Sequence, residues 1–232
     1  MGNNIFTIGA RIRSGNLRLA AKRQNLLSLL PDEVKAKIEV FADGGALHKA
    51  AVAGDVDEVR ALVRAGGARV NHMRGYYCFT ALHDAARKGQ VDAMEVLVRE
   101  LGADVNATDV VGKTALHYAA EEGHVGAIRF LVKELADVGT TDQFGATALH
   151  CATWRGHVEA MRVLVIELGA DVNAAGRSLS RWTPLHYAAH DEEVEAMRVL
   201  VEELGANVHA REDCGRTPID FDSTGTLATW LA

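Results

Sequence analysis

The sequence lacks several features that would place it in other protein classes. Its 232 residues include 3 prolines and 3 cysteines, and no apolar run approaches the length of about 18 residues that a transmembrane helix needs. The three cysteines (Cys78, Cys151 and Cys214) are too few and too far apart for a disulfide framework, which favours a reducing compartment. Scarce proline beside 22 glycines predicts helices that end at glycines.

Acidic residues are missing from the first 31 positions, although the whole chain has a net charge of −6. Residues 1–40 contain seven Lys or Arg and three acids, whereas the remaining 192 residues contain 18 and 28. The chain therefore divides into a basic N-terminal arm with a short helix, residues 1–40, and an acidic body, residues 41–232.

The body consists of one repeated unit. Full copies that begin with Thr-Ala-Leu-His or Thr-Pro-Leu-His start at Thr80, Thr114, Thr147 and Thr183. A weaker first copy precedes them at Ala46, and a truncated one closes the chain from Thr217. Successive threonines are 34, 33, 36 and 34 residues apart, and a period of this length predicts a stacked array of helical units.

The sequence of each repeat unit predicts two helices. The threonine is suited to cap the first helix, and a glycine such as Gly89 then supplies a left-handed turn. In the second helix of that unit, Val91, Met94, Leu97 and Val98 have the spacing of a single buried stripe. A polar turn then leads to the next threonine.

The motifs "TALHYAA", "GHVEAMRVLV" and "GADVNA" resemble ankyrin repeats over about residues 44–232. The resemblance implies an all-α solenoid of helix–turn–helix units with projecting hairpin fingers, comprising about five full repeats and a truncated C-terminal cap. It also implies a protein that binds other proteins and is not an enzyme. By the same resemblance, Asn106 and Asn173 are candidate acceptors for hydroxylation. The second helix is one residue longer than the usual family pattern, which predicts a changed superhelical pitch.

One constellation resembles a metal or acid/base site, because His117, Glu121 and His124 fall at i, i+4 and i+7. Comparison of the units argues against such a site. The histidine position recurs in every full unit, but the carboxylate position does not. We therefore interpret these histidines as framework residues that hydrogen-bond between neighbouring loops.

A second, weaker metal candidate is the pair His186 and His190, one helical turn apart. No third ligand stands at a fixed spacing, so a framework histidine beside an acidic turn is the favoured interpretation. Glu192 and Glu193 replace the usual Gly-His here, which predicts a locally distorted turn. The sequence predicts no catalytic residue, no bound metal and no cofactor.

Residues that depart from the repeat template lie in the fingers and just before the helix-breaking glycines. Exposed aromatic and basic side chains at such positions are typical of interface hot spots. The predicted partner-binding residues are Tyr76, Tyr77, Phe79, Lys88, Val111, Lys113, Phe144, Trp154, Arg155, Arg181 and Trp182. The alternative is that the longer fingers fold back and bury their rings.

The arm has several interpretations. Its cations before the predicted helix are Arg11, Arg13, Arg18, Lys22 and Arg23. They are compatible with an organelle transit peptide, a contact with an anionic surface, an anchor in an assembly, or a cap on the first repeat. We expect a cytoplasmic protein, with organelle targeting as the alternative, and nucleic acid is not an expected partner.

The sequence therefore predicts a scaffold or adaptor that binds another protein through the concave face and finger tips of the repeat stack. The alternative is an accessory structural subunit of a larger assembly, held there by the basic arm.

Overall fold

The computed structural model describes residues 45–64, 68–176 and 181–230. These residues belong to a compact unit that spans Gly44–Ala232. The predicted basic arm lies outside the described residues, with its cations Arg11, Arg13, Arg18, Lys22 and Arg23.

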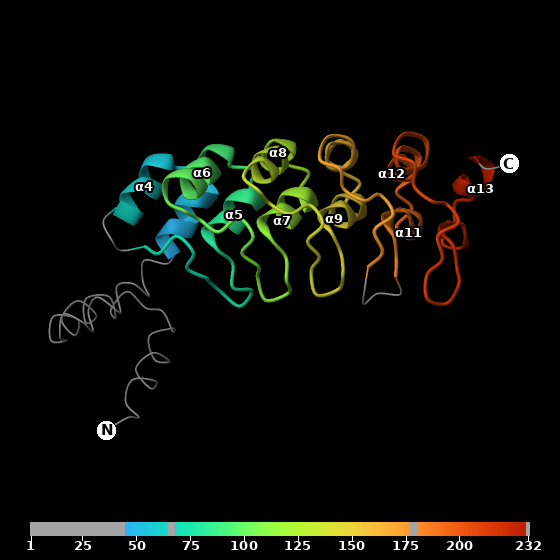
Figure 1. The fold of residues 1–232 in the computed structure, drawn as a ribbon, viewed down its shortest axis with the longest axis horizontal. Coiled ribbons are helices and arrows are strands. Elements are labelled where there is room, and N and C mark those ends of the chain that lie inside the picture. The colour runs from blue at the N-terminus through green and yellow to red at the C-terminus, as the bar shows by residue number, and fades with distance from the viewer. Residues whose placement is uncertain (1–44, 65–67, 177–180, 231–232) are drawn as a thin grey trace, which may run out of the picture. The chain divides into compact units, whose positions relative to one another are not determined.

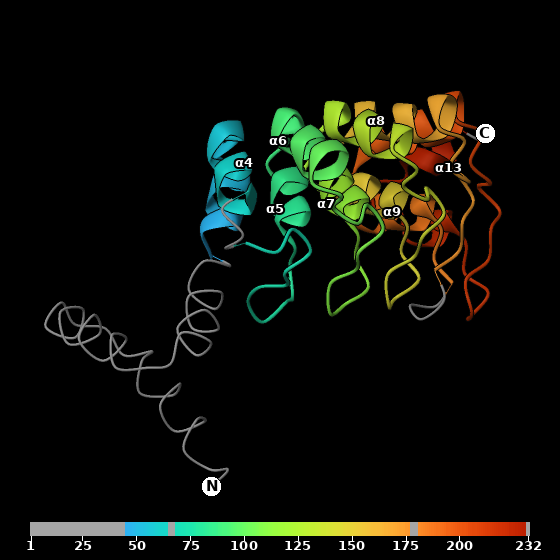
Figure 2. The same cartoon turned by 60° about the vertical axis from the view of Figure 1, so that its left-hand side comes forward.

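The described chain forms two layers of helices with loops beneath them (Figures 1 and 2). The inner layer holds residues 45–53, α5 (Ala81–Arg87), α7 (Ala115–Glu121), α9 (Ala148–Trp154) and α11 (Pro184–His190). The outer layer holds α4 (Val56–Arg64), α6 (Val91–Glu95) with η1 (Val96–Glu100), α8 (Val125–Lys133), α10 (Val158–Arg162) with η2 (Val163–Glu167), and α12 (Val194–Arg198) with η3 (Val199–Glu203). A short 3₁₀-helix, η4 (Pro218–Asp220), and α13 (Thr226–Trp230) follow the fifth repeat.

The loops that link consecutive repeats are the predicted fingers, and all project on the side of the inner helices (Figure 1). Regular structure in the described residues is helical, apart from one isolated antiparallel bridge between Arg74 and Phe79 in the first finger. The prediction of an all-α solenoid with projecting fingers is confirmed.

In the second to fifth repeats, the threonine and histidine begin the inner helix together. In the third repeat the Thr114 backbone N–H donates to His117 Nδ1 over 3.1 Å. His117 Nε2 then donates to the Ala146 carbonyl of the next finger over 3.1 Å. Equivalent contacts join His83 to Thr80 and Lys113, His150 to Thr147 and Trp182, and His186 to Thr183 and Arg216. The prediction of framework histidines that connect neighbouring loops is confirmed.

The core runs between the two layers without a break from one repeat to the next. Alanines such as Ala119 and Ala120 are fully buried in the inner helices, where their small side chains let adjacent repeats approach closely. The outer helices contribute larger side chains, among them Met94 and Leu97, which are also fully buried. In the truncated C-terminal repeat, Leu227 is fully buried and belongs to the same core.

The extra residue of the second helix is accommodated in a π-helical turn. The last turns of three outer helices, η1, η2 and η3, are π-helical, whereas α8 in the third repeat is a regular α-helix. The third repeat has one residue fewer before its next threonine. A local π turn thus accounts for the added residue, as is usual for insertions into helices.

The expectation of a distorted turn at Glu192 was wrong. Glu192 adopts a φ of 60°, close to the 72° of Gly123 at the equivalent position. The Val194 N–H donates to the Glu192 carbonyl just as the Val125 N–H donates to Gly123. The stacked helices impose the left-handed turn even where the residue is not glycine.

Candidate protein-binding surface

The described parts of the fingers lie side by side along the stack below the helices (Figure 2), and the inner helices α5, α7, α9 and α11 end in the residues just before the helix-breaking turns. We call the fingers and these C-terminal helix ends the finger surface. All eleven predicted partner-binding residues lie on it, so the stacking of repeats gathers positions that are spread over more than 100 residues of sequence.

Buried carboxylates hold the fingers in shape. Asp109 Oδ1 accepts the N–H groups of Val111 and Lys113 over 2.9 and 2.8 Å. Asp142 repeats this arrangement with the N–H groups of Phe144 and Ala146, both over 2.9 Å. These bonds fix each hairpin from within, which keeps the finger tips in defined positions.

Neighbouring fingers are also joined to one another. The Val110 N–H donates to the Tyr77 carbonyl over 3.1 Å, and the Gln143 N–H donates to the Val111 carbonyl over 2.8 Å. The first three fingers therefore form a connected row, so their tips have little freedom to move independently.

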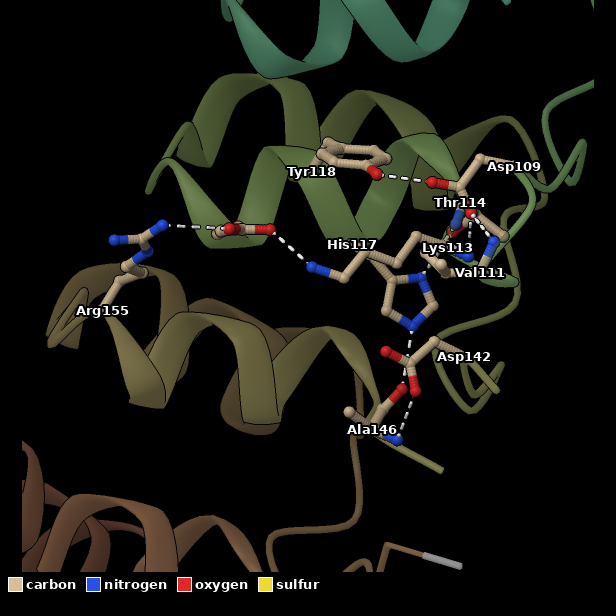
Figure 3. Close-up of polar contacts among 10 residues, drawn as sticks. Asp109, Val111, Lys113, Thr114, His117, Tyr118, Asp142, Ala146 and Arg155 are labelled. Atoms are coloured by element: carbon tan, nitrogen blue, oxygen red, sulfur yellow. Dashed lines mark hydrogen bonds and ion pairs between the residues drawn. The ribbon is translucent and has the colours of Figure 1, made fainter. Parts of the chain in front are cut away.

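A charged network crosses the third and fourth repeats (Figure 3). Glu121 at the end of α7 accepts from Lys113 Nζ over 2.7 Å and from Arg155 Nη2 over 3.2 Å. Burial raises the pKa of Glu121, but its two basic partners outweigh that effect and leave the pKa below its ordinary value. Lys113 is thus held in an ion pair, with its side chain only 18% exposed.

Tyr118 extends this polar region toward the second finger. Its hydroxyl donates to Asp109 Oδ2 over 2.6 Å, as Figure 3 shows. Burial and the adjacent Asp109 carboxylate both raise the pKa of Tyr118, so the phenol remains protonated. Tyr118 therefore braces the hairpin and offers no acid/base chemistry near neutral pH.

The constellation of His117, Glu121 and His124 does not form a site. Glu121 points to the basic network described above, and His117 is bonded at both ring nitrogens. His124 Nε2 contacts the Arg87 carbonyl of the preceding repeat over 3.2 Å. Burial lowers the pKa of His117, which therefore stays neutral.

The weaker metal candidates are also engaged elsewhere. His186 contacts Thr183 and the Arg216 carbonyl, and His190 Nδ1 lies 2.6 Å from Asp191 Oδ1. Among the described residues, no group of three His, Cys, Asp or Glu side chains is arranged to hold a metal ion.

The predicted aromatic residues divide into two groups. Tyr76 is 88% exposed and Tyr77 54%, while Phe144 and Trp154 are 43% and 46% exposed. Arg155 lies over the Trp154 ring, 4.6 Å from its centroid.

The second group packs against the following repeat. Phe79 lies edge-on to Tyr118, with ring centroids 5.1 Å apart. Trp182 lies edge-on to Tyr187 and to Phe221, at 5.2 and 4.8 Å. Phe79 and Trp182 are both half-buried. For these two residues, the alternative expectation that the longer fingers fold back and bury their rings therefore describes the structure.

The remaining predicted residues also differ in their exposure. Lys88 and Arg181 are exposed, and Val111 is half-buried between the second and third fingers. Arg181 has a φ of 56°, so the end of the fourth finger turns through the left-handed region.

Sequence reasoning missed two sets of bonds between repeats. On the outer helices, arginines bond to glutamates of the next repeat in the pairs Arg60–Glu100, Arg99–Glu134, Arg129–Glu167 and Arg162–Glu203. At the base of the fingers, asparagine side chains accept backbone N–H groups in the pairs Asn71–Asp104, Asn106–Asp137 and Asn173–Asn207. In the arginine–glutamate pairs, the glutamate stands at the same position of the second to fifth repeats. That recurrence is the sequence signal that would have indicated these bonds between the outer helices.

Comparison with protein families agrees with this architecture. A family model described as ankyrin repeats (3 copies) matches residues 17–109 and 102–176, and a single ankyrin repeat matches residues 180–213. The chain therefore belongs to the ankyrin repeat family, whose repeats are generally protein-interaction modules and typically not catalytic. The first match begins at residue 17, inside the segment treated above as a non-repetitive arm. No match was found among curated proteins, and no helix of the described residues has the length and apolar character to cross a bilayer.

Proposed function

We propose that this chain is a non-catalytic scaffold or adaptor that binds a partner protein through its finger surface. One observation carries the proposal: every exposed aromatic side chain among the described residues lies there. These side chains are Tyr76, Tyr77, Phe144 and Trp154. Exposed aromatic clusters of this kind mark interaction sites more often than they mark neutral surface.

The outer helices provide the contrast. Their exposed large apolar residues are aliphatic and scattered, namely Leu135, Ile166 and Val194. Their arginines and glutamates are largely paired with one another across repeats. A surface of paired charges and single aliphatic residues is typical of a solvated face.

The rigidity of the finger surface supports the same function. Hydrogen bonds within the second and third fingers and between the first three fingers hold these tips in place before a partner arrives. A preorganised surface loses less conformational entropy on binding, so more of its contact energy appears as affinity.

Quantitative affinity capture from native lysate tests this proposal. The baits are the full chain, the Trp154→Ala/Phe144→Ala variant, and a matched control on the outer helices, Ile166→Ala, whose side chain is 65% exposed. We expect the double variant to lose the dominant partner by roughly fivefold or more, as hot-spot residues do, and Ile166→Ala to retain it.

A fourth bait that lacks residues 1–40 separates the alternative function. Loss of the partner on this deletion, with no effect of the aromatic changes, would replace the adaptor proposal by that of an accessory subunit anchored through its arm. If neither the deletion nor the aromatic changes reduce capture of the partner, both the adaptor proposal and the accessory-subunit alternative fail.

A further inference from the structure

The charge of the finger surface is uneven, and its N-terminal end carries two cations, Arg74 and Lys88, that form no ion pair with another described residue. We infer that this end binds an acidic peptide segment that also carries aromatic or aliphatic side chains. The inference rests on the proposed function and specifies the partner chemistry of that same surface. We call the region the first-finger patch, which comprises Arg74, Tyr76, Tyr77, Arg87, Lys88 and Val110.

Aromatic contacts build the floor of this patch. Tyr76 meets Tyr77 edge-on at 5.4 Å between centroids, and Tyr77 stacks on Phe79 at 5.7 Å. Phe79 in turn packs against Tyr118 of the next repeat. The rings thus form a chain that is anchored at one end in the core and open at the other, where Tyr76 is almost fully exposed. Such anchored, exposed rings supply contact area at little cost in conformational entropy.

The backbone holds this aromatic floor in position. Arg74 and Phe79 exchange two backbone hydrogen bonds, of 2.7 and 3.0 Å, across the base of the first finger. The Val110 N–H ties the second finger to the Tyr77 carbonyl, which places the exposed Val110 beside the tyrosines.

Three cations belong to the patch, and one of them, Arg87, contacts its rings, while the Arg74 guanidinium lies beside Gly45. The Arg87 guanidinium lies over the Phe79 ring, 5.7 Å from its centroid, and its Nε is buried without a hydrogen-bond partner. Its nearest carboxylate oxygen, on Asp84, is 3.9 Å from Nη2. Lys88 follows in the chain and is exposed, and Arg74 is exposed on the finger itself. Neither Lys88 nor Arg74 forms an ion pair with another described residue.

Two acids beside the patch, one preceding Arg87 and one preceding Val110, are already engaged. Asp84 Oδ2 lies 2.7 Å from His48 Nδ1. Asp109 accepts two backbone N–H groups and the Tyr118 hydroxyl. No acidic residue occurs between positions 68 and 83. The patch therefore presents positive charge on a protein whose net charge is −6, and carboxylates supplied by a partner are the complement it lacks.

A protein segment fits this surface better than a nucleic acid does. Three cations beside a net-negative body are few for a polyphosphate, whose binding depends on neutralising many phosphates. Exposed tyrosines and valine match the apolar side chains of a peptide, while the cations match its Asp and Glu residues. An acidic segment with interspersed aromatic or aliphatic residues satisfies both features.

Selection from a random peptide library displayed on phage, with the full chain as bait, tests the inference. We expect the selected peptides to be enriched in Asp and Glu together with aromatic or aliphatic residues. Enrichment of basic peptides, no enrichment, or tighter binding of a single-stranded RNA pool than of the selected peptides would overturn it.

Fluorescence anisotropy with a selected peptide then locates the contact. Arg74→Glu/Lys88→Glu should raise the Kd about tenfold or more, and Tyr76→Ala about fivefold, because charge pairing and an exposed ring are both lost. The control is the single charge reversal Lys133→Glu at an exposed position of α8, and it is compared with Lys88→Glu alone, which is the same charge change within the patch. An equal effect of Lys133→Glu, or no effect of the patch variants, would overturn the inference.

The two proposals fail in distinguishable ways. If Trp154→Ala/Phe144→Ala abolishes capture of the lysate partner while the patch variants change nothing, the adaptor function holds and the first-finger patch is not its acidic-peptide site. If neither set of changes affects capture, the adaptor function itself fails.

Discussion

The second and third repeats share the same repeat template but end their outer helices differently. The second repeat ends with the π turn η1, and its Ala103 N–H bonds to the Leu97 carbonyl six residues back over 2.8 Å. The third repeat lacks one residue, and its Ala136 N–H bonds to the Leu131 carbonyl five residues back over 2.9 Å. Ala103 and Ala136 are nonetheless almost equally buried, at 8% and 7% exposure.

This difference shows which parts of the unit the stack requires. The core position of the alanine is kept in both repeats, and the helix changes its winding to keep it there. The shorter repeat has two local disadvantages. Leu135 adopts a φ of 70° where the second repeat has Gly102, and Gly139 stands where Asn106 would bond to the next repeat. Packing between repeats therefore outweighs local backbone preference.

The largest expected effect concerns the buried framework histidine that the second and third repeats share with the fourth. Burial lowers the pKa of His83 and His117 from an ordinary value of 6.5, and that of His150 to about 4. Because the unfolded chain binds these protons more readily, stability is fully present above about pH 6.5 and declines as the pH falls toward the folded-state values. For His150 alone the full shift corresponds to about 3 kcal/mol. Urea unfolding measured between about pH 5 and 6.5 should show this decline.

Single histidine substitutions show which residues cause the loss of stability at low pH. His150→Gln and His117→Gln should each reduce the slope of the unfolding free energy against pH, and Ile166→Ala, which removes no titrating group, should leave it unchanged. A reduction for His150 but none for His117 would show that the third repeat does not share the framework.

A smaller effect is expected at the strained leucine of the third repeat. Leu135 is 84% exposed, so Leu135→Gly removes little packing but relieves a left-handed backbone that costs a non-glycine residue about 1–2 kcal/mol. After the entropy that glycine adds to the unfolded chain, we expect a net stabilisation of about 1 kcal/mol, measured by urea unfolding. The control is Leu101→Gly in the second repeat, where φ is −110° and the side chain packs on the core. That change should destabilise, and stabilisation by both would contradict the assignment of strain to Leu135.

The smallest effect concerns the asparagine bond that the third repeat lacks. Gly139→Asn should supply an acceptor for the Asp171 N–H, as Asn106 does for the Asp137 N–H. An exposed bond of this kind contributes about 0.5 kcal/mol. The reciprocal change, Asn106→Gly, should lose at least as much in the second repeat, and thermal unfolding of both variants measures the pair. Gains from both substitutions would show that the bond is not what distinguishes the repeats.

Much of the fold could be predicted from the sequence. The period of the threonines predicted the stack, and comparison of the units identified His117 as a framework residue before its two hydrogen bonds were seen. The sequence did not show which aromatic side chains of the fingers are buried and which are exposed. Trp182 is half-buried because Tyr187 and Phe221 lie beside it, and Phe221 belongs to the following repeat. Tyr76 carries a similar ring in a similar loop and remains exposed.

The sequence by itself determined the period of the repeats, the order of the two helices in each, and the threonine that caps the inner helix of the second to fifth repeats. These features depend on bonds within one repeat or on a period that every repeat shares. Only the tertiary structure decided which variable side chains form the finger surface. It brought Lys113, Glu121 and Arg155 into one network and left Arg74 and Lys88 unpaired among the described residues. The physical reason is that exposure and ion pairing depend on distances between repeats, and those distances are set by how the buried helices pack.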